Sequence, residues 1–237
     1  MQQNQNKEIK MTYNTPHKRL AFLLFICTIV LFLSPNLHSY ICANGSGDGF
    51  CDPDGGKESG CNNVIINNYI EEGAGYFLNS YSNALYFLNR VELSNLKGID
   101  CVEWSNILNS AVANIKNAKG TYFQLIKTAE STPYNQKIIS KLKSFDYYYF
   151  MKENDLNGVI FNEVADFLKN GDIIGVYKWI YLRISEIEDI LFFIKIEMNF
   201  HGIPALTNLW KLNGAYSRAL LFGQYVAMLF DAISEEV

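Results

Sequence analysis

The stretch that decides the fold is LWKLNGAYSRALLFGQYVAMLFDAI, residues 209–233. Apolar or small residues recur in it at strictly alternating intervals of three and four, at Leu209, Leu212, Tyr216, Ala219, Gly223, Val226, Phe230 and Ile233. This spacing brings them to one face of an α-helix, because the helix completes a turn in about 3.6 residues. A strict three-four alternation is typical of helices that pack nearly parallel in bundles. We therefore expect a long last helix that buries this row.

The same spacing extends through the chain from Asn62 onward. Rows of apolar residues recur at helical intervals over residues 66–91, 104–129, 138–149, 158–169 and 176–198. The connecting segments are short, and no stretch alternates polar and apolar residues for long enough to indicate a strand. We expect an all-α protein, an up-down helical bundle of about five to six helices over residues 62–237.

Capping and breaking residues set the expected helix boundaries. Thr132 and Pro133 have the pattern of a helix start, with proline in the first turn. That third helix is expected to continue through Tyr149. The other signals are a capping box at Asp100 and Glu103, an end at Asn170 and Gly171 before a cap at Asp172, and a stop at Gly202 before Pro204.

Residues 1–43 have the pattern of a secretory signal. A Lys-Arg pair precedes the apolar run LAFLLFICTIVLFL at residues 20–33, and a Ser-Pro pair ends it. The run is too short to span about 30 Å of hydrocarbon comfortably as a helix. We expect cleavage after Ser39 or Ala43, a secreted or periplasmic mature chain, and no stable membrane span after cleavage. The alternative is an uncleaved N-terminal membrane anchor.

Residues 44–61, NGSGDGFCDPDGGKESGC, are expected to form an irregular loop segment before the bundle, because glycine, aspartate, serine and proline dominate them. Four carboxylates among glycines are hard oxygen donors that suit Ca²⁺, namely Asp48, Asp52, Asp54 and Glu58. EF-hand spacing fails, since Gly56 takes the place of a side-chain ligand. We favour a solvated tether over a Ca²⁺ site, and no other cofactor is expected.

The beginning of this segment resembles the short Cys-rich repeats of bacterial secreted proteins. GDGFCDP at residues 47–53 follows the repeat pattern CGDGxCDPxxGE, whereas Ser46 stands where its first cysteine would be. The resemblance covers residues 47–61 and implies an extracytoplasmic setting. It implies nothing about the helices that follow.

Cysteine pairing is expected within the same segment. An exported chain meets an oxidising compartment, and Cys51 and Cys61 flank one flexible loop, so we expect them to form a disulfide. Cys101 is expected to stay unpaired, because a continuous first helix of about 45 Å separates it from Cys61. Cleavage after Ser39 would retain Cys42, which then becomes an alternative partner for Cys101.

Charge and motif content narrow the function classes. The chain carries 20 basic and 24 acidic residues, and four of the basic residues but one acidic residue lie in the expected signal. The mature chain is therefore acidic, which disfavours nucleic acid as a partner. No catalytic motif of known mechanics is present. We expect a non-enzymatic exported protein that binds a protein partner or has a structural role, with a small-ligand or Ca²⁺-binding module as the alternative and an unrecognised enzyme third.

Four features inside the bundle carry more polar or aromatic groups than packing needs. They are the aromatic run at residues 145–150, Glu197 one helical turn before His201, the acidic turn at Glu186, Glu188 and Asp189, and the last helix. The first three are explained more simply by burial, by the helix terminus and by solvation. In the last helix the extra groups are Asn208, Trp210, Asn213, Arg218, Gln224 and Tyr225. A pocket, if present, is expected there.

Overall fold

The structure is a computed structural model that describes residues 58–94, 101–134, 136–156 and 158–235. Over these residues it contains helices and no strand, which confirms the all-α prediction. The helices are α3 (Glu58–Ser94), α4 (Cys101–Glu130), α5 (Gln136–Ser144), α6 (Tyr147–Glu153), α7 (Val159–Lys169), α8 (Ile173–His201) and α9 (Leu206–Glu235).

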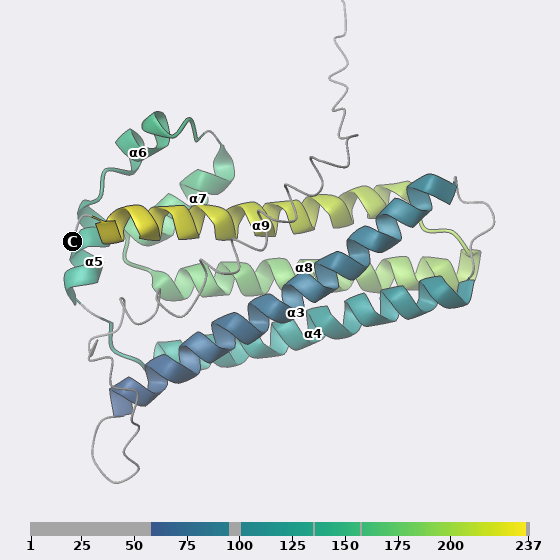
Figure 1. Ribbon diagram of the computed structural model, residues 1–237, viewed down its shortest axis with the longest axis horizontal. Coiled ribbons are helices and arrows are strands. Elements are labelled where there is room, and N and C mark those ends of the chain that lie inside the picture. The colour runs from purple at the N-terminus through teal and green to yellow at the C-terminus, as the bar shows by residue number, and fades with distance from the viewer. Residues whose placement is uncertain (1–57, 95–100, 135, 157, 236–237) are drawn as a thin grey trace, which may run out of the picture.

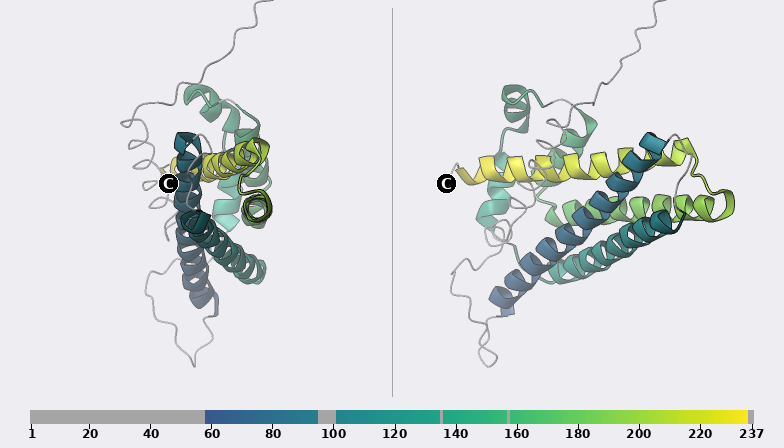
Figure 2. Two further views of the ribbon diagram at one scale, coloured as in Figure 1. Left: turned by 90° about the vertical axis from the view of Figure 1, so that its right-hand side faces the viewer. Right: turned by 45° about the vertical axis from the view of Figure 1, so that its right-hand side comes forward.

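Four long helices make the bundle and alternate in direction along the chain (Figure 1). Each packs on the next, α3 on α4, α4 on α8 and α8 on α9. Figure 2 shows α3 tilted across the direction of α8 and α9, while the short helices α5, α6 and α7 lie at one end of the bundle, between α4 and α8 in the chain. None of the described helices combines the length and hydropathy that crossing a membrane requires.

The core consists of the rows that the sequence predicts. The row on α4 is buried at every position, at Trp104, Leu108, Ala111, Ile115, Ala118, Tyr122, Leu125 and Ala129. On α9 the predicted row is buried except at Ala219, which is half-buried. The periodicity therefore identified the inward faces of both helices correctly.

The third predicted helix is wrong in two respects. It begins at Gln136 instead of the Thr132-Pro133 pair, because Thr132 Oγ1 donates to the Thr128 carbonyl at 2.8 Å and closes the end of α4. It also breaks before Asp146, whose carboxylate accepts from the Tyr149 N–H at 2.9 Å and caps a new helix, α6. This break explains why seven helices are described where five to six were expected.

The start of the bundle differs from the prediction as well. Helix α3 begins at Glu58, so Glu58 and Cys61 belong to the helix and not to the preceding loop segment. The remaining boundaries in the described part agree: the Asp172 carboxylate caps α8 through the Gly175 N–H at 2.7 Å, and Gly202 ends α8 with a positive φ of 67°.

A buried hydroxyl pair links three of the long helices. Ser80 Oγ on α3 donates to the Ala111 carbonyl on α4 at 2.7 Å and lies 2.7 Å from the hydroxyl of Tyr216 on α9. A serine hydroxyl has one proton and the carbonyl can only accept, so Tyr216 donates to Ser80. Burial raises the pKa of Tyr216, which keeps its hydroxyl a donor. The rings of Phe77 and Tyr81 pack against Tyr216, with centroids 5.5 Å and 5.2 Å away.

Helices α3 and α4 are in tight contact at Gly73. A Cβ at this position would lie 2.8 Å from Cε2 of Tyr122, a buried residue of α4. Burial also raises the pKa of Tyr122 to about 12. The glycine thus makes room for a tyrosine ring at the contact between the two helices.

Gly73→Ala is therefore expected to lower the free energy of unfolding by about 1–3 kcal/mol, because the added methyl group overpacks the Tyr122 contact. Gly75→Ala is the matched control, since a Cβ there meets no atom within 4 Å. It is expected to raise stability by about 0.5–1 kcal/mol, as alanine does at unstrained helical glycines. Chemical denaturation of both variants makes the comparison. Equal stabilisation of the two would show that Tyr122 does not constrain α3.

Candidate functional site

A groove of about 840 Å³ lies between α8 and α9. Its α8 wall is formed by residues that recur every three or four positions, Leu182, Ser185, Glu186, Asp189, Ile190 and Phe193. Its α9 wall is formed in the same way by Asn208, Lys211, Gly214, Ala215 and Arg218. The groove is thus formed by one face of α8 and one face of α9, which run antiparallel.

The two walls of the groove carry charges of opposite sign. Glu186 and Asp189 lie on α8, and Lys211 and Arg218 lie on α9. Within the described part of the chain neither of these basic side chains forms an ion pair. The groove therefore offers acidic groups along one side and basic groups along the other.

The register between the two helices is fixed at both ends of the groove. At one end Asn208 Nδ2 donates to Glu197 Oε1 at 2.8 Å. At the other end the rings of Trp179 and Phe222 stack with centroids 3.7 Å apart and planes 6° from parallel. Counting along both helices from the Glu197–Asn208 contact places Glu186 and Arg218 about one residue apart in level, and counting from the Trp179–Phe222 stack places them about three residues, or roughly 5 Å, apart.

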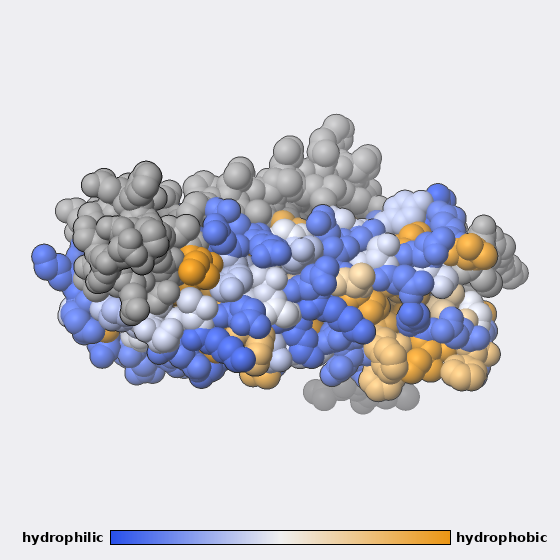
Figure 3. Space-filling view, turned by 90° about the horizontal axis from the view of Figure 1, so that it is seen from below, coloured by the Kyte–Doolittle hydropathy of each residue, from blue (hydrophilic) through white to orange (hydrophobic). Residues whose placement is uncertain are grey.

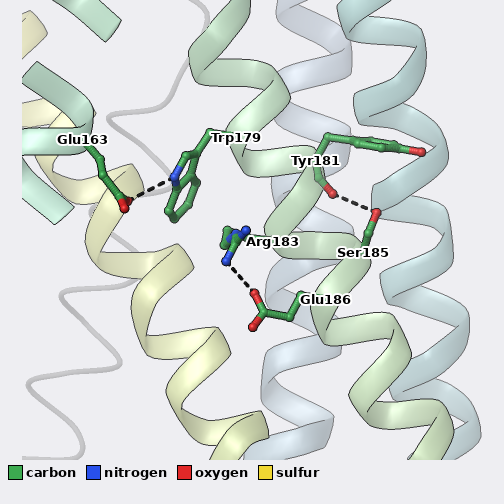
Figure 4. A network of polar contacts seen from close by, with 6 residues as sticks. All are labelled: Glu163, Trp179, Tyr181, Arg183, Ser185 and Glu186. Atoms are coloured by element: carbon green, nitrogen blue, oxygen red, sulfur yellow. Dashed lines mark hydrogen bonds and ion pairs between the residues drawn. The ribbon is translucent and has the colours of Figure 1, made fainter. Parts of the chain in front are cut away.

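A network of contacts holds the Trp179 end of the groove (Figure 4). Trp179 Nε1 donates to Glu163 Oε2 of α7 at 3.1 Å, and the Arg183 guanidinium carbon lies 5.3 Å from the centroid of the Trp179 ring system. Arg183 Nη1 also bonds Glu186 Oε2 at 2.7 Å, which positions one carboxylate of the acidic wall. Arg183 Nε is buried without a hydrogen-bond partner among the described residues. The end of the groove nearest Trp179 is therefore held in place by the contacts among Phe222, Trp179, Arg183 and Glu186.

The apolar part of the groove is only partly covered. Leu182 is 55% exposed and Phe193 is 57% exposed, which is high for large apolar side chains beside a core. A Cβ at Gly214, in the α9 wall, would meet no atom of the described chain within 4 Å. Space between the walls is therefore open, and its apolar lining faces solvent.

Further apolar side chains are exposed near the turn that joins α8 to α9. They are Phe200, Ile203, Leu206 and Trp210, and Phe192 is exposed nine residues before the end of α8. The surface view in Figure 3 shows apolar residues gathered toward the end of the molecule that carries this turn. A gathering of exposed apolar residues marks an interaction site more often than scattered single residues do.

The structure unites residues that the sequence singled out separately. Asn208 and Arg218 of the last helix and Glu186 and Asp189 of the acidic turn line the same groove. Glu188 points elsewhere, since its carboxylate bonds Lys119 of α4 at 2.7 Å. The other polar and aromatic groups singled out on α9 do not line it: Trp210 and Asn213 are exposed, Gln224 is half-buried and Tyr225 is buried.

Sequence reasoning missed the groove residues Leu182, Phe193, Lys211 and Gly214. Each fits the same spacing of three or four residues as its neighbours in the wall. That spacing was a usable signal, but it was applied only to the inward rows. An outward row on two adjacent helices could have indicated the groove.

The aromatic run at residues 145–150 is divided between the core and the surface. Tyr147 is buried, and its hydroxyl donates to the Leu142 carbonyl at 2.5 Å. Tyr148 and Tyr149 are exposed. Phe145 packs against Tyr147 with ring centroids 5.1 Å apart. The run thus packs one face of a short helix, and the exposed tyrosines do not line the groove.

Glu197 and His201 do not act together. Glu197 Oε2 accepts from the Ala205 N–H at 2.9 Å, and Oε1 accepts from Asn208, so the carboxylate joins the end of α8 to the start of α9. His201 is exposed at the last position of α8, where a positive charge is favourable to the helix dipole.

Metal and disulfide predictions fall mostly outside the described residues. Asp48, Asp52, Asp54 and Cys51 lie outside them, while Glu58 and Cys61 lie in the first turns of α3. Over the described ranges, histidine, cysteine, aspartate and glutamate do not gather in groups of three or more that could hold a metal ion. The solvated tether, its Ca²⁺-binding alternative and the Cys51–Cys61 bond remain predictions from the sequence.

Glu197→Ala is expected to lower the free energy of unfolding by about 1–2 kcal/mol, because it leaves the Ala205 N–H and the Asn208 amide without their acceptor. His201→Ala, four residues away on the same helix, is the control and is expected to change stability by less than about 0.5 kcal/mol. Thermal and chemical unfolding measure both. A larger loss from the histidine variant would show that His201 has a partner role of its own.

Comparison with known proteins gives no relative to guide the function: no family model, no curated protein and no solved structure matches this chain.

Proposed function

We propose that this chain is an exported, non-enzymatic binding protein that takes a helical segment of a protein partner into the groove between α8 and α9. The observation that carries the proposal is the groove itself, with its half-covered apolar side chains and oppositely charged walls. An amphipathic helix is a common occupant of such a groove, because its apolar face replaces the missing packing and its flanks carry charges.

The exposure of the lining favours a protein segment over a small molecule. Small-ligand sites bury about 70–90% of their ligand, and they are mostly enclosed by apolar side chains. Here Leu182 and Phe193, 11 positions apart on α8, are both more than half exposed. This distance is about 16 Å along the helix, roughly three turns of an occupant helix.

The chemistry of the lining supports binding over catalysis. Ser185 is the hydroxyl in the groove, and its Oγ donates to the Tyr181 carbonyl of its own helix at 3.0 Å. A serine nucleophile needs a neighbouring base that accepts its proton, and here that proton goes to a backbone carbonyl. Glu186 is held by Arg183, so one of the two carboxylates has a structural partner.

The export part of the proposal rests on the leader pattern at residues 1–43, and its test is the mass of the mature chain. Expression in a host with an active secretory pathway is expected to yield a soluble exported chain that begins at Tyr40 or Asn44. Intact-mass measurement identifies the first residue, and a variant with charged residues placed in the 20–33 run is the control for export. A full-length chain retained in the membrane fraction would instead establish the uncleaved anchor.

The proposal that a protein partner occupies the groove predicts that the partner can be crosslinked from a position in the groove and not from a position elsewhere. Position 214 lies in the α9 wall, and a Cβ there meets no described atom within 4 Å, so a photoreactive phenylalanine analogue can be introduced there beside the groove. The same analogue at Gly120, an exposed glycine of α4 that is equally open, is the matched control. Irradiation of the exported material is expected to crosslink a protein through position 214 and not through position 120. Absence of a crosslink at 214, or equal crosslinking at both positions, would refute the groove as a binding site.

A further inference from the structure

We infer that the partner in the groove is a second copy of this chain, related to the first by a two-fold axis that runs along the groove. The inference rests on the proposed function and adds the identity of the partner. It follows from the register of the two walls, from the signs of their charges and from the apolar side chains between them.

The register makes the groove complementary to itself. A two-fold axis along the groove leaves every residue at its own level and exchanges the two walls, so that α8 of one copy lies against α9 of the other. Glu186 and Arg218 lie within about one to three residues of the same level within one chain, an offset of roughly 2–5 Å that two long charged side chains can span. In the dimer each Glu186 therefore meets the Arg218 of the second copy, and this contact forms twice.

The basic charges of the groove have no ion-pair partner within one described chain, whereas Glu186 already pairs with Arg183 of its own helix. Arg218 and Lys211 form no ion pair in the described part of the molecule, although Glu186 and Asp189 line the opposite wall of the same groove. A partner helix with one sign of charge would satisfy one wall and leave the other unpaired. A second copy brings an acidic wall to the basic wall and a basic wall to the acidic wall at the same time.

The apolar side chains then become the centre of a four-helix interface. Leu182, Ile190 and Phe193 of the two copies lie in this interface on the same face of α8 as Glu186 and Asp189, with α8 and α9 of each chain supplying two helices. Homodimer interfaces resemble a protein core divided between two chains, with large apolar residues at the centre and charges at the rim. The high exposure of Leu182 and Phe193 in one chain has this explanation.

Two charge reversals test the geometry, separately and then mixed. Glu186→Lys places an ammonium group against Arg218 of the second copy, and Arg218→Glu places a carboxylate against Glu186 of the second copy. Each variant alone is expected to bind itself at least about tenfold more weakly than the wild-type chain does, because both contacts in its dimer become repulsive. An equimolar mixture of the two variants is expected to restore association, because both contacts of the mixed dimer are attractive. One is the original pair of Glu186 and Arg218, and the other is the charge-reversed pair of Lys at position 186 and Glu at position 218.

Sedimentation velocity on the full exported chain measures mass in each case. Lys116→Glu, an exposed charge reversal on α4 outside the groove, is the control and is expected to stay dimeric. Circular dichroism shows that each variant keeps its helix content. Mixed-variant rescue separates an interface effect from a folding effect, because mixing cannot repair a misfolded chain.

The inference is overturned by any of several outcomes. A wild-type chain that stays monomeric at its highest soluble concentration excludes the second copy, and so does a dimer that neither charge reversal weakens. A mixture that fails to restore association excludes the two-fold axis along the groove. The crosslink at position 214 separates the two proposals: a product of twice the chain mass supports the second copy. A product with a different protein overturns the second copy and leaves the proposed function standing.

Discussion

The hydroxyl pair of Ser80 and Tyr216 is the constraint on which the arrangement of α9 depends. Both groups are fully buried, and an unsatisfied buried hydroxyl costs about 1–3 kcal/mol, so α9 cannot rotate away from α3 without losing the bond. Successive residues of a helix lie about 100° apart, so Gly214 and Arg218 lie about 160° from Tyr216. Holding Tyr216 inward therefore turns Gly214 and Arg218 toward the outside. The same contact that closes the bundle thus exposes the wall of the groove.

The groove requires α8 to be fixed against α9 as firmly as α9 is fixed against α3. Glu197 does this at one end, where it accepts from both Ala205 and Asn208, and the stack of Trp179 on Phe222 does it at the other. Between these two points the helices contribute their outward faces to a shared surface. The levels of the charges follow from these end contacts, because two helices pinned at two points have no freedom to slide.

The sequence predicted the inward faces well and the short helices poorly. The rows of α4 and α9 repeat over many turns, so one misplaced residue does not obscure them. The helix predicted over residues 131–149 was wrong because local side-chain hydrogen bonds of Thr132 and Asp146 compete with helix formation. Helix propensity does not include such bonds. For the groove, Glu186, Asp189, Asn208 and Arg218 stood out individually. Their meeting depends on the register between α8 and α9, which the contacts of Glu197 and Trp179 determine and which no single helix encodes.

Two glycines differ in whether a contact within the described chain explains them. Gly73 costs helix stability relative to alanine, and the ring of Tyr122 explains it because no larger residue fits. Gly214 carries a similar cost of about 1 kcal/mol in the middle of α9, yet nothing in the described part of its own chain approaches it. Gly120 is equally open, so open space alone does not identify a site. What distinguishes Gly214 is its position between Lys211 and Arg218 on the wall of a groove whose apolar lining is half exposed. A glycine there keeps the α9 wall open beside two basic side chains, so that a side chain of an opposing surface has room to enter the groove at this point.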